Sequence, residues 1–127
     1  MIPADLKYTK DHEWLRLEGD TATVGITHFA QDQLTDIVFV ELPEVGRQVK
    51  PGDATAVLES VKSVADVFAP LAGEITDVNK VLEQHPEYVN ESPYENGWIF
   101  KIKIDGADTS QLLDAQAYQA FLDSQEN

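Results

Sequence analysis

The chain contains no cysteine, one methionine and no long apolar segment. Without cysteine it cannot form disulfide bonds, use a thiolate in catalysis or bind a metal through cysteine sulfur. Its apolar runs, such as residues 37–40, are far shorter than the roughly 20 residues that a membrane-spanning helix needs. Residues 1–5 have the features of neither a secretion signal nor an arginine-rich transit peptide. We therefore expect a soluble, cytoplasmic protein.

Basic residues are scarce as well. The chain has 9 lysines and arginines against 23 aspartates and glutamates, which gives a formal net charge of −14. Such a surface repels phosphate backbones and anionic lipids, so we expect neither nucleic acid nor membrane as a partner. It favours encounters with proteins that carry basic surfaces. The charge taken alone fits a role in solubility equally well.

The candidates for catalysis and metal binding are few. His12, His28 and His85 stand apart and match no metal-ligand spacing, so each is interpreted as a surface or capping residue and no metal site is predicted. An enzyme needs a nucleophile and a base. The best pair would be Ser60 or Ser63 with a distant histidine, and nothing in the sequence positions such a pair. We expect no catalytic residue.

Alternating apolar and polar residues predict a mainly β protein. Residues 14–17 and 22–26 flank a turn and predict a hairpin, and Thr27 then suits the N-cap of a short helix. From Ser110 onward apolar residues recur at helical spacing, with Asp108 or Asp114 as the cap of a helix that packs against the sheet. Further strands are expected at residues 37–41, 45–49, 54–59, 64–68, 73–78 and 98–104, with a helical turn and loop at 79–89.

A Pro-x-x-Gly pattern occurs twice, 27 residues apart, at residues 43–46 and 70–73. A repeat of this length usually indicates one supersecondary unit used twice, because one copy cannot bury its own apolar face. We expect the two copies to face each other as a small sandwich, with Gly46 and Gly73 required by the backbone. The joining chain then turns outside the sandwich, and Lys62 lies at its tip. The lysine should be presented to solvent.

The segment around Lys62 and its flanking repeats resembles the lipoyl-attachment region of the glycine cleavage system H proteins. Its sequence reads Glu59-Ser60-Val61-Lys62, followed by Asp66-Val67-Phe68-Ala69-Pro70. The resemblance continues over about residues 6–122. Further matching segments are residues 6–8, 12–14, 24–27, 30–31, 38–43, 73–75, 78–79, 89–90, 92–94, 97–98 and 117–118.

The resemblance implies a barrel-sandwich hybrid of the lipoyl/biotinyl type, with an N-terminal β-hairpin, a short helix and a C-terminal helix. Residues 1–127 would form a single lipoyl-carrier domain, with a sandwich core at about residues 22–104 and a C-terminal helical segment at about 109–124. Lipoate would be attached to Lys62 through an amide bond. The chain would be a carrier and not an enzyme.

The same resemblance implies the partners of such a carrier. It would take an aminomethyl group from a pyridoxal-phosphate glycine decarboxylase to a tetrahydrofolate-dependent aminomethyltransferase, and electrons to a flavin-containing dihydrolipoamide dehydrogenase. Lipoate-attaching enzymes would modify Lys62. We expect a monomer that makes brief contacts with these proteins.

Three acidic residues acquire roles from the resemblance. Glu13 and Asp66 would line a cleft and hold the ammonium of the loaded arm by charge-assisted hydrogen bonds. They could equally be ordinary surface acids of an acidic protein. Glu59 would help the modifying enzyme to recognise the tip, or would only solvate it. Gly25 is expected to allow a close approach of a neighbouring element or of the arm, or to mark a bulge.

Several related classes remain as alternatives. A biotin carrier would place methionines beside the lysine, where this chain has Val61 and Ser63. A lipoyl domain of a 2-oxoacid dehydrogenase would have Asp-Lys at the tip and a Pro/Ala-rich linker. An H-like lipoyl carrier for another pathway, such as sulfur-compound oxidation or lipoyl relay, is the nearest alternative. In an unmodified adaptor, Lys62 would be an ordinary exposed lysine.

Overall fold

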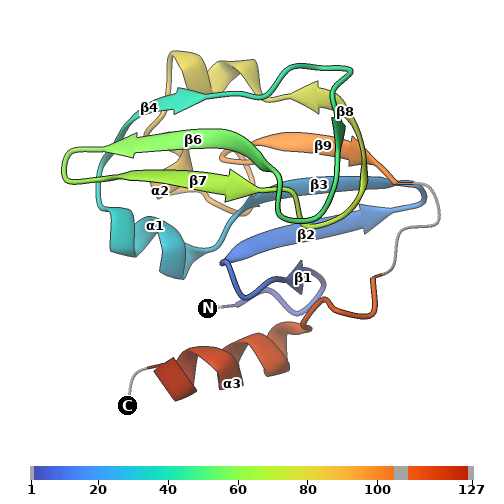
Figure 1. The fold of residues 1–127 in the computed structure, drawn as a ribbon. Coiled ribbons are helices and arrows are strands. Elements are labelled where there is room, and N and C mark those ends of the chain that lie inside the picture. Colours follow the sequence, from blue (N-terminus) through green and yellow to red (C-terminus); the bar gives the residue numbers. More distant parts are fainter. Residues whose placement is uncertain (1, 105–108, 126–127) are drawn as a thin grey trace.

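The computed structural model describes residues 2–104 and 109–125 and consists mainly of two antiparallel sheets (Figure 1). The strands are β1 (Lys7–Tyr8), β2 (Glu13–Glu18), β3 (Thr21–Ile26), β4 (Ile37–Glu41), β5 (Gln48–Val49), β6 (Ala54–Ser60), β7 (Val64–Phe68), β8 (Gly73–Val78) and β9 (Phe100–Lys103). One sheet has six strands in the order β1-β2-β3-β9-β8-β5. The other has three, in the order β4-β6-β7. The mainly β prediction is confirmed.

The helices are short except at the C-terminal end. They are α1 (His28–Leu34), the 3-10 helix η1 (Lys80–Glu83), α2 (Tyr88–Glu91) and α3 (Ala115–Gln125). Thr27 is the N-cap of α1, because its Oγ1 accepts the N–H of Ala30 at 3.3 Å. Asp114 caps α3 by accepting the N–H of Ala117 at 2.8 Å, while Asp108, the other expected cap, lies outside the described residues. Within residues 2–104 and 109–125, no helix is long and apolar enough to cross a membrane.

The predicted first hairpin is confirmed as β2–β3. Its ladder is unbroken, and it pairs Trp14 directly with Gly25. A Cβ added at Gly25 would lie 2.7 Å from the Trp14 indole, so the glycine is there to admit the ring. Close approach, and not a bulge, explains this position. Trp14 is fully buried, and its indole N–H donates to the Pro93 carbonyl at 2.9 Å.

The two repeat copies do not face each other as expected. Their strands, β4 and β7, lie on either side of β6 in the three-stranded sheet. After each of these strands the polypeptide passes to the six-stranded sheet, as β5 after the first copy and as β8 after the second. The repeat correctly indicates a strand followed by a turn in each copy. It does not indicate that both strands pair with β6, which lies between the two copies in the sequence. Gly46 adopts a φ of 97°, whereas a Cβ at Gly73 would collide with the Lys103 carbonyl oxygen. Both glycines are backbone requirements, for different reasons.

Two strands are shorter than predicted. β5 covers only Gln48–Val49, because Val45 and Gly46 belong to the preceding turn. β9 starts at Phe100 and not at Trp98, whose indole is half-buried and lies 5.2 Å from the Lys101 ammonium. The predicted alternation holds within the strand, where Phe100 and Ile102 are buried.

The main core lies between the two sheets. It includes Leu15, Val24, Val40, Leu58, Val67, Ile75, Phe100 and Ile102, which are all at most 2% exposed. A second cluster joins β1 and β2 to α3 through Leu6, Tyr8, Trp14, Tyr118 and Leu122. The rings of Tyr8 and Tyr118 stack at 4.8 Å. The C-terminal helix is thereby fixed against the N-terminal strands, below the six-stranded sheet in Figure 1.

Candidate functional site

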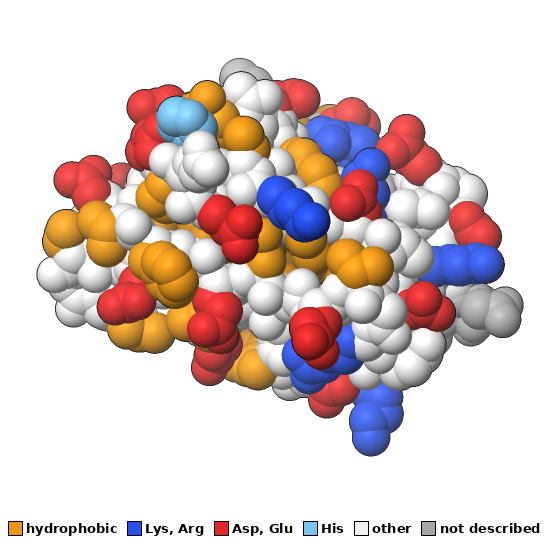
Figure 2. Space-filling view, turned by 90° about the horizontal axis from the view of Figure 1, so that it is seen from above, with side chains coloured by type: hydrophobic (Ala, Val, Ile, Leu, Met, Phe, Trp, Pro, Cys, Tyr) orange, Lys and Arg blue, Asp and Glu red, His pale blue; other side chains and the backbone are white. Residues whose placement is uncertain are grey.

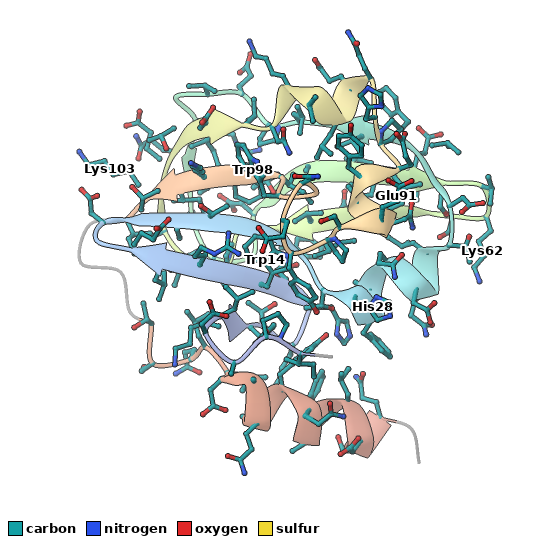
Figure 3. The ribbon with its side chains drawn as sticks, turned by 180° about the vertical axis from the view of Figure 1, so that it is seen from behind. Trp14, His28, Lys62, Glu91, Trp98 and Lys103 are labelled. Atoms are coloured by element: carbon teal, nitrogen blue, oxygen red, sulfur yellow. The ribbon has the colours of Figure 1, made fainter. Side chains whose placement is uncertain are left out.

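Lys62 lies at the tip of the β6–β7 hairpin, and its side chain is exposed. Figure 3 shows it at one end of the molecule, with Lys103 at the opposite end. Among residues 2–104 and 109–125, its ammonium has no ion-pair or hydrogen-bond partner. Val61 and Val64 beside it are 69% and 64% exposed. Figure 2 shows apolar and acidic side chains together at the end of the molecule that carries this hairpin.

The tip, residues 60–63, turns without glycine, asparagine or proline because Ser60 supplies the turn chemistry. Its hydroxyl accepts the N–H groups of Lys62 and Ser63 at 3.3 and 3.0 Å and donates to the Ser63 carbonyl at 3.1 Å. The Ser60 N–H also donates to the Ser63 carbonyl, at 2.8 Å. A serine hydroxyl can close such a turn over the next residues. Ser60 was present in the motif, but its role was not predicted.

The tip is also tied to the body of the protein. The Val61 N–H donates to the Asp36 carbonyl at 3.1 Å, and Ser60 pairs with Ile37 of β4. The backbone on either side of the lysine is therefore held while its side chain projects into solvent. A primary amine presented in this way fits the attachment of an acyl group by a separate enzyme.

A cleft of about 200 Å³ lies beside this hairpin, between α1, the start of β2 and the outer strand β7. We call it the α1–β7 cleft. Phe29, Ala30 and Leu34 of α1 form an apolar wall, while Glu13 and Asp66 line it from β2 and β7. The structure thus places the two predicted carboxylates in one cleft. A more open hollow of about 440 Å³ lies over β5 and β8, and none of its lining residues belongs to the hairpin.

Glu13 is unusual for an acidic residue because it is buried, with only 2% of its surface exposed. Its Oε1 accepts the Thr9 hydroxyl at 2.7 Å, and its Oε2 accepts the Phe68 N–H at 3.3 Å. Burial raises the pKa of Glu13 to about 7, although these two hydrogen bonds act in the opposite direction. The carboxyl therefore changes charge near neutral pH. A cation that enters the cleft would favour its ionised form.

The other two predicted acids have different surroundings. Asp66 is exposed on β7, opposite Val57. Glu59 is exposed on β6, between Phe39 of β4 and Val64 of β7. It does not line the α1–β7 cleft. The structure brings Asp66 and Glu13 together and leaves Glu59 on the outer sheet face.

His12 is a cleft residue that was interpreted wrongly as a surface or capping histidine. It is half-buried with a φ of 70°, it lines the cleft, and its ring lies 4.7 Å from that of Phe29. A hydrogen bond of 2.8 Å joins its Nδ1 to the Tyr118 hydroxyl, which also bonds Thr27 Oγ1 at 2.8 Å. Burial lowers the pKa of His12. No local signal could reveal this role, because Tyr118 is 106 residues away.

The remaining histidines lie apart from the cleft carboxylates. His28 is exposed at the start of α1, and its N–H donates to the Tyr94 hydroxyl at 2.9 Å. His85 pairs with Glu87 at 3.0 Å on the surface. In the described part of the chain, no group of three or more histidine and acidic side chains could hold a metal ion.

Sequence comparisons identify close relatives along the whole chain. A sequence model described as "Glycine cleavage H-protein" matches residues 6–125. The glycine cleavage system H protein of a Thermus thermophilus strain is 58% identical over 125 residues, which cover 98% of both chains. That of an Escherichia coli strain is 56% identical over 126 residues, again covering 98% of both. The expected resemblance is confirmed.

A structural comparison gives the same result. The crystal structure of a glycine cleavage system H protein from Mycobacterium marinum matches with a TM-score of 0.86 and 36% identity. The match covers 99% of this chain and 100% of the other. The fold is the predicted barrel-sandwich type, with its short helices and C-terminal helix. As in that family, the protein is a lipoyl carrier and not a catalyst. The chain belongs to the glycine cleavage H-protein family.

Proposed function

We propose that this chain is the lipoylated shuttle of a glycine cleavage system, with lipoate bound to Lys62 as an amide. It carries an aminomethyl group from glycine decarboxylase to aminomethyltransferase and electrons to dihydrolipoamide dehydrogenase. The observation that carries the proposal is the geometry of the hairpin. An exposed lysine on a held tip lies next to an apolar cleft that contains a buried carboxyl group.

The residues of the tip supply a fixed base for a mobile arm. When bound, lipoate supplies the sulfur pair that accepts the one-carbon unit and the electrons. Lys62 adds four methylenes of reach, while the hydrogen bonds of Ser60 and Val61 keep the backbone in place. Amide formation removes the charge of the lysine, so the net charge falls from −14 by one, to −15.

Glu13 and Asp66 hold the ammonium of the aminomethyl cargo in this proposal. The hydrogen bonds from Thr9 and Phe68 fix the Glu13 carboxyl, and its oxygens retain lone pairs for a further donor. An incoming ammonium would lower the pKa of Glu13 from about 7 and complete a charge-assisted pair. A buried acid of this kind is not explained by solubility. The exposed Asp66 supplies a second charge at the cleft.

Glu59 contributes to recognition by a lipoate-attaching enzyme. Two observations support this role: Glu59 is exposed three residues before Lys62, and it lies between two exposed apolar side chains, Phe39 and Val64. An enzyme that acylates Lys62 must bring the lysine nitrogen into its own active site. It therefore meets this face of the sheet directly.

The whole chain acts as one carrier domain, because α3 packs on β1 and β2 through the second apolar cluster. We infer a monomer that works in the cytoplasm. The net charge of −14 supports brief contacts with basic surfaces of the partner enzymes, because such contacts form quickly and are weakened by salt.

The first test is the intact mass of the protein from cells that can attach lipoate. We expect one lipoyl group on the native protein and none on Lys62→Arg, with Lys80→Arg as an exposed control. Unmodified native protein would contradict the attachment. Bicarbonate–glycine exchange with purified glycine decarboxylase then distinguishes glycine cleavage from another lipoyl pathway, because only the former requires this carrier for exchange.

The second test concerns the cleft carboxylates. In the loaded protein, the double variant Glu13→Ala/Asp66→Ala should lose ammonia and formaldehyde faster than the native protein, because the ammonium has lost its partners. Glu41→Ala, which removes an exposed acid of β4 that does not line the cleft, is the control. Equal decay of the double variant and the native protein would remove Glu13 and Asp66 from this role.

A further inference from the structure

The connection between α1 and β4 contains a strained residue. Thr35 has φ 63° and ψ −150°, a combination that is almost confined to glycine. A side chain is kept in such a conformation only where the surrounding contacts fix the backbone on both sides. The Thr35 N–H donates to the Gln31 carbonyl at 3.0 Å, which ends α1. Another group must hold the residues that follow.

Asn90 of α2 provides this second attachment. Its Nδ2 donates to the Thr35 carbonyl at 2.7 Å and to Gln31 Oε1 at 2.9 Å, and its Oδ1 accepts the Ile37 N–H at 2.9 Å. One side chain therefore bonds the backbone on both sides of Asp36. These partners are 53 to 59 residues away in the sequence, so the contact is purely tertiary.

Asp36, between the two bonded residues, is the residue that holds the lysine tip. Its carbonyl accepts the N–H of Val61, directly before Lys62, at 3.1 Å. Figure 3 shows Glu91, the neighbour of Asn90, on the same side of the molecule as Lys62. The contacts thus run from Asn90 through residues 35–37 to the base of the proposed lipoyl arm.

Residues 35–37 also follow directly on α1, the helix that forms the apolar wall of the cleft. α1 contributes Phe29, Ala30 and Leu34 to the α1–β7 cleft, and residues 35–37 follow it without interruption. We propose that Asn90 is a positioning residue for the lipoyl arm, which clamps residues 35–37 and so fixes the Lys62 tip relative to the cleft wall. This inference rests on the proposed function. Because the mobile arm has a limited reach, a shift of its base changes how readily the cargo reaches Glu13.

The clamp is tested first by amide hydrogen exchange on the unmodified protein. In the native chain, the N–H groups of Ile37 and Val61 should open together, with the same free energy and the same denaturant dependence. A Val61 amide that opens independently of Ile37 would overturn the clamp. This measurement needs no variant and no lipoate.

Asn90→Ala then has a matched control in Asn79→Ala. The Asn79 amide also donates to two acceptors, the carbonyls of Asn96 and Trp98, both at 2.8 Å, and neither acceptor lies in residues 35–37. After correction for global stability, Val61 should exchange about tenfold faster in Asn90→Ala and at the native rate in Asn79→Ala. Equal protection of Val61 in the two variants would contradict the proposal.

The last measurement is the lifetime of the cargo on loaded protein. Asn90→Ala should shorten it, and Asn79→Ala should not. Faster Val61 exchange with an unchanged lifetime would refute the positioning role. A native protein that carries no lipoyl group would instead refute the proposed function, and the exchange results would still decide whether the clamp exists.

Discussion

The Lys62 tip and the α1–β7 cleft lie side by side, but they are built in different ways. The turn of the tip is closed by residues within four positions of one another, because Ser60 bonds Lys62 and Ser63, and Asp36 holds this turn in place. The cleft is assembled from β2, α1 and β7, and its buried carboxyl bonds a backbone N–H 55 residues away. A local turn can present a lysine. A desolvated carboxyl needs walls that only the tertiary fold supplies.

The largest effect should come from the tip. Lys62→Arg keeps the positive charge but cannot accept a lipoyl group, so lipoylation and all carrier activity should be lost completely. The fold should be unaffected, because the side chain is exposed and makes no polar contact among the described residues. Intact mass and thermal unfolding check both statements. A large drop in melting temperature would mean that the Lys62 side chain, and not only the backbone of the tip, contributes to the stability of the fold.

The next effect concerns the charge of the cleft. The pKa of Glu13 is about 7 in the folded protein against an ordinary value of 4.5, so the folded state binds more protons between these values. The stabilising effect of this bound proton is fully present below about pH 4.5 and is lost as the pH rises through about 7. The glutamine of Glu13→Gln cannot ionise, so the free energy of unfolding of this variant, relative to that of the native protein, should rise by up to about 3 kcal/mol when the pH is raised from 5 to 8.

Urea unfolding of both proteins at pH 5 and pH 8 measures this gain. Asp66→Asn is the control on the exposed side of the cleft, where we expect a change within about 0.5 kcal/mol at either pH. A difference between Glu13→Gln and the native protein that is the same at both pH values would show that Glu13 is not titrating as its burial indicates.

A smaller effect is expected from a change in the C-terminal helix, which should affect the α1–β7 cleft but not the Lys62 tip. Tyr118→Phe removes the hydroxyl that bonds His12 and Thr27, at a cost of about 1–2 kcal/mol. Chemical shifts of His12 and Phe29 should change, while those of Lys62 and Ser63 should not. Tyr88→Phe is a control with an aromatic ring in α2. Shifts that spread to the tip would show that the two regions are coupled through α3.

The smallest effect is expected from the turn itself. Ser60→Ala removes three hydrogen bonds at an exposed site, so the protein should lose about 1 kcal/mol and the Lys62 amide should exchange faster. Ser63→Ala is the control, because no hydrogen bond of the Ser63 hydroxyl occurs in the described part of the chain. The cleft residues should be unaffected by either change. If Ser63→Ala has the larger effect, the assignment of the turn to Ser60 is wrong.

The same contrast explains what the sequence could predict. Strand positions, the first hairpin, the Thr27 cap and the exposed lysine follow from periodicity and turn chemistry over a few residues. The relation between the two repeats was predicted wrongly, because the pairing of β4 and β7 is decided by β6. His12 and the ends of β5 and β9 were missed for a similar reason. His12 bonds the distant Tyr118, β5 begins after the chain has passed from the smaller sheet to the larger one, and the Trp98 N–H donates to the Glu95 carbonyl before β9 begins.

For the site, the sequence predicts which residues matter but not how each of them is buried. Lys62, Glu13, Asp66 and Glu59 could be named from a resemblance, but nothing in the sequence distinguishes a buried acid from an exposed one. The structure separates them, since Glu13 is 2% exposed while Asp66 and Glu59 lie on the surface. Desolvation, and with it a pKa near 7, is a property of the packing around Glu13 and not of the motif.

The bond between Glu13 and the Phe68 N–H joins the cleft to the edge of the three-stranded sheet. β7 is the last strand of its sheet, and an open strand margin can recruit a second molecule into a continuous sheet. The Glu13 carboxyl accepts the Phe68 N–H at that edge, and α1 lies across the cleft from β7. Glu13, whose pKa burial raises to about 7, thus also occupies a backbone donor on the outer strand of the lysine-bearing hairpin.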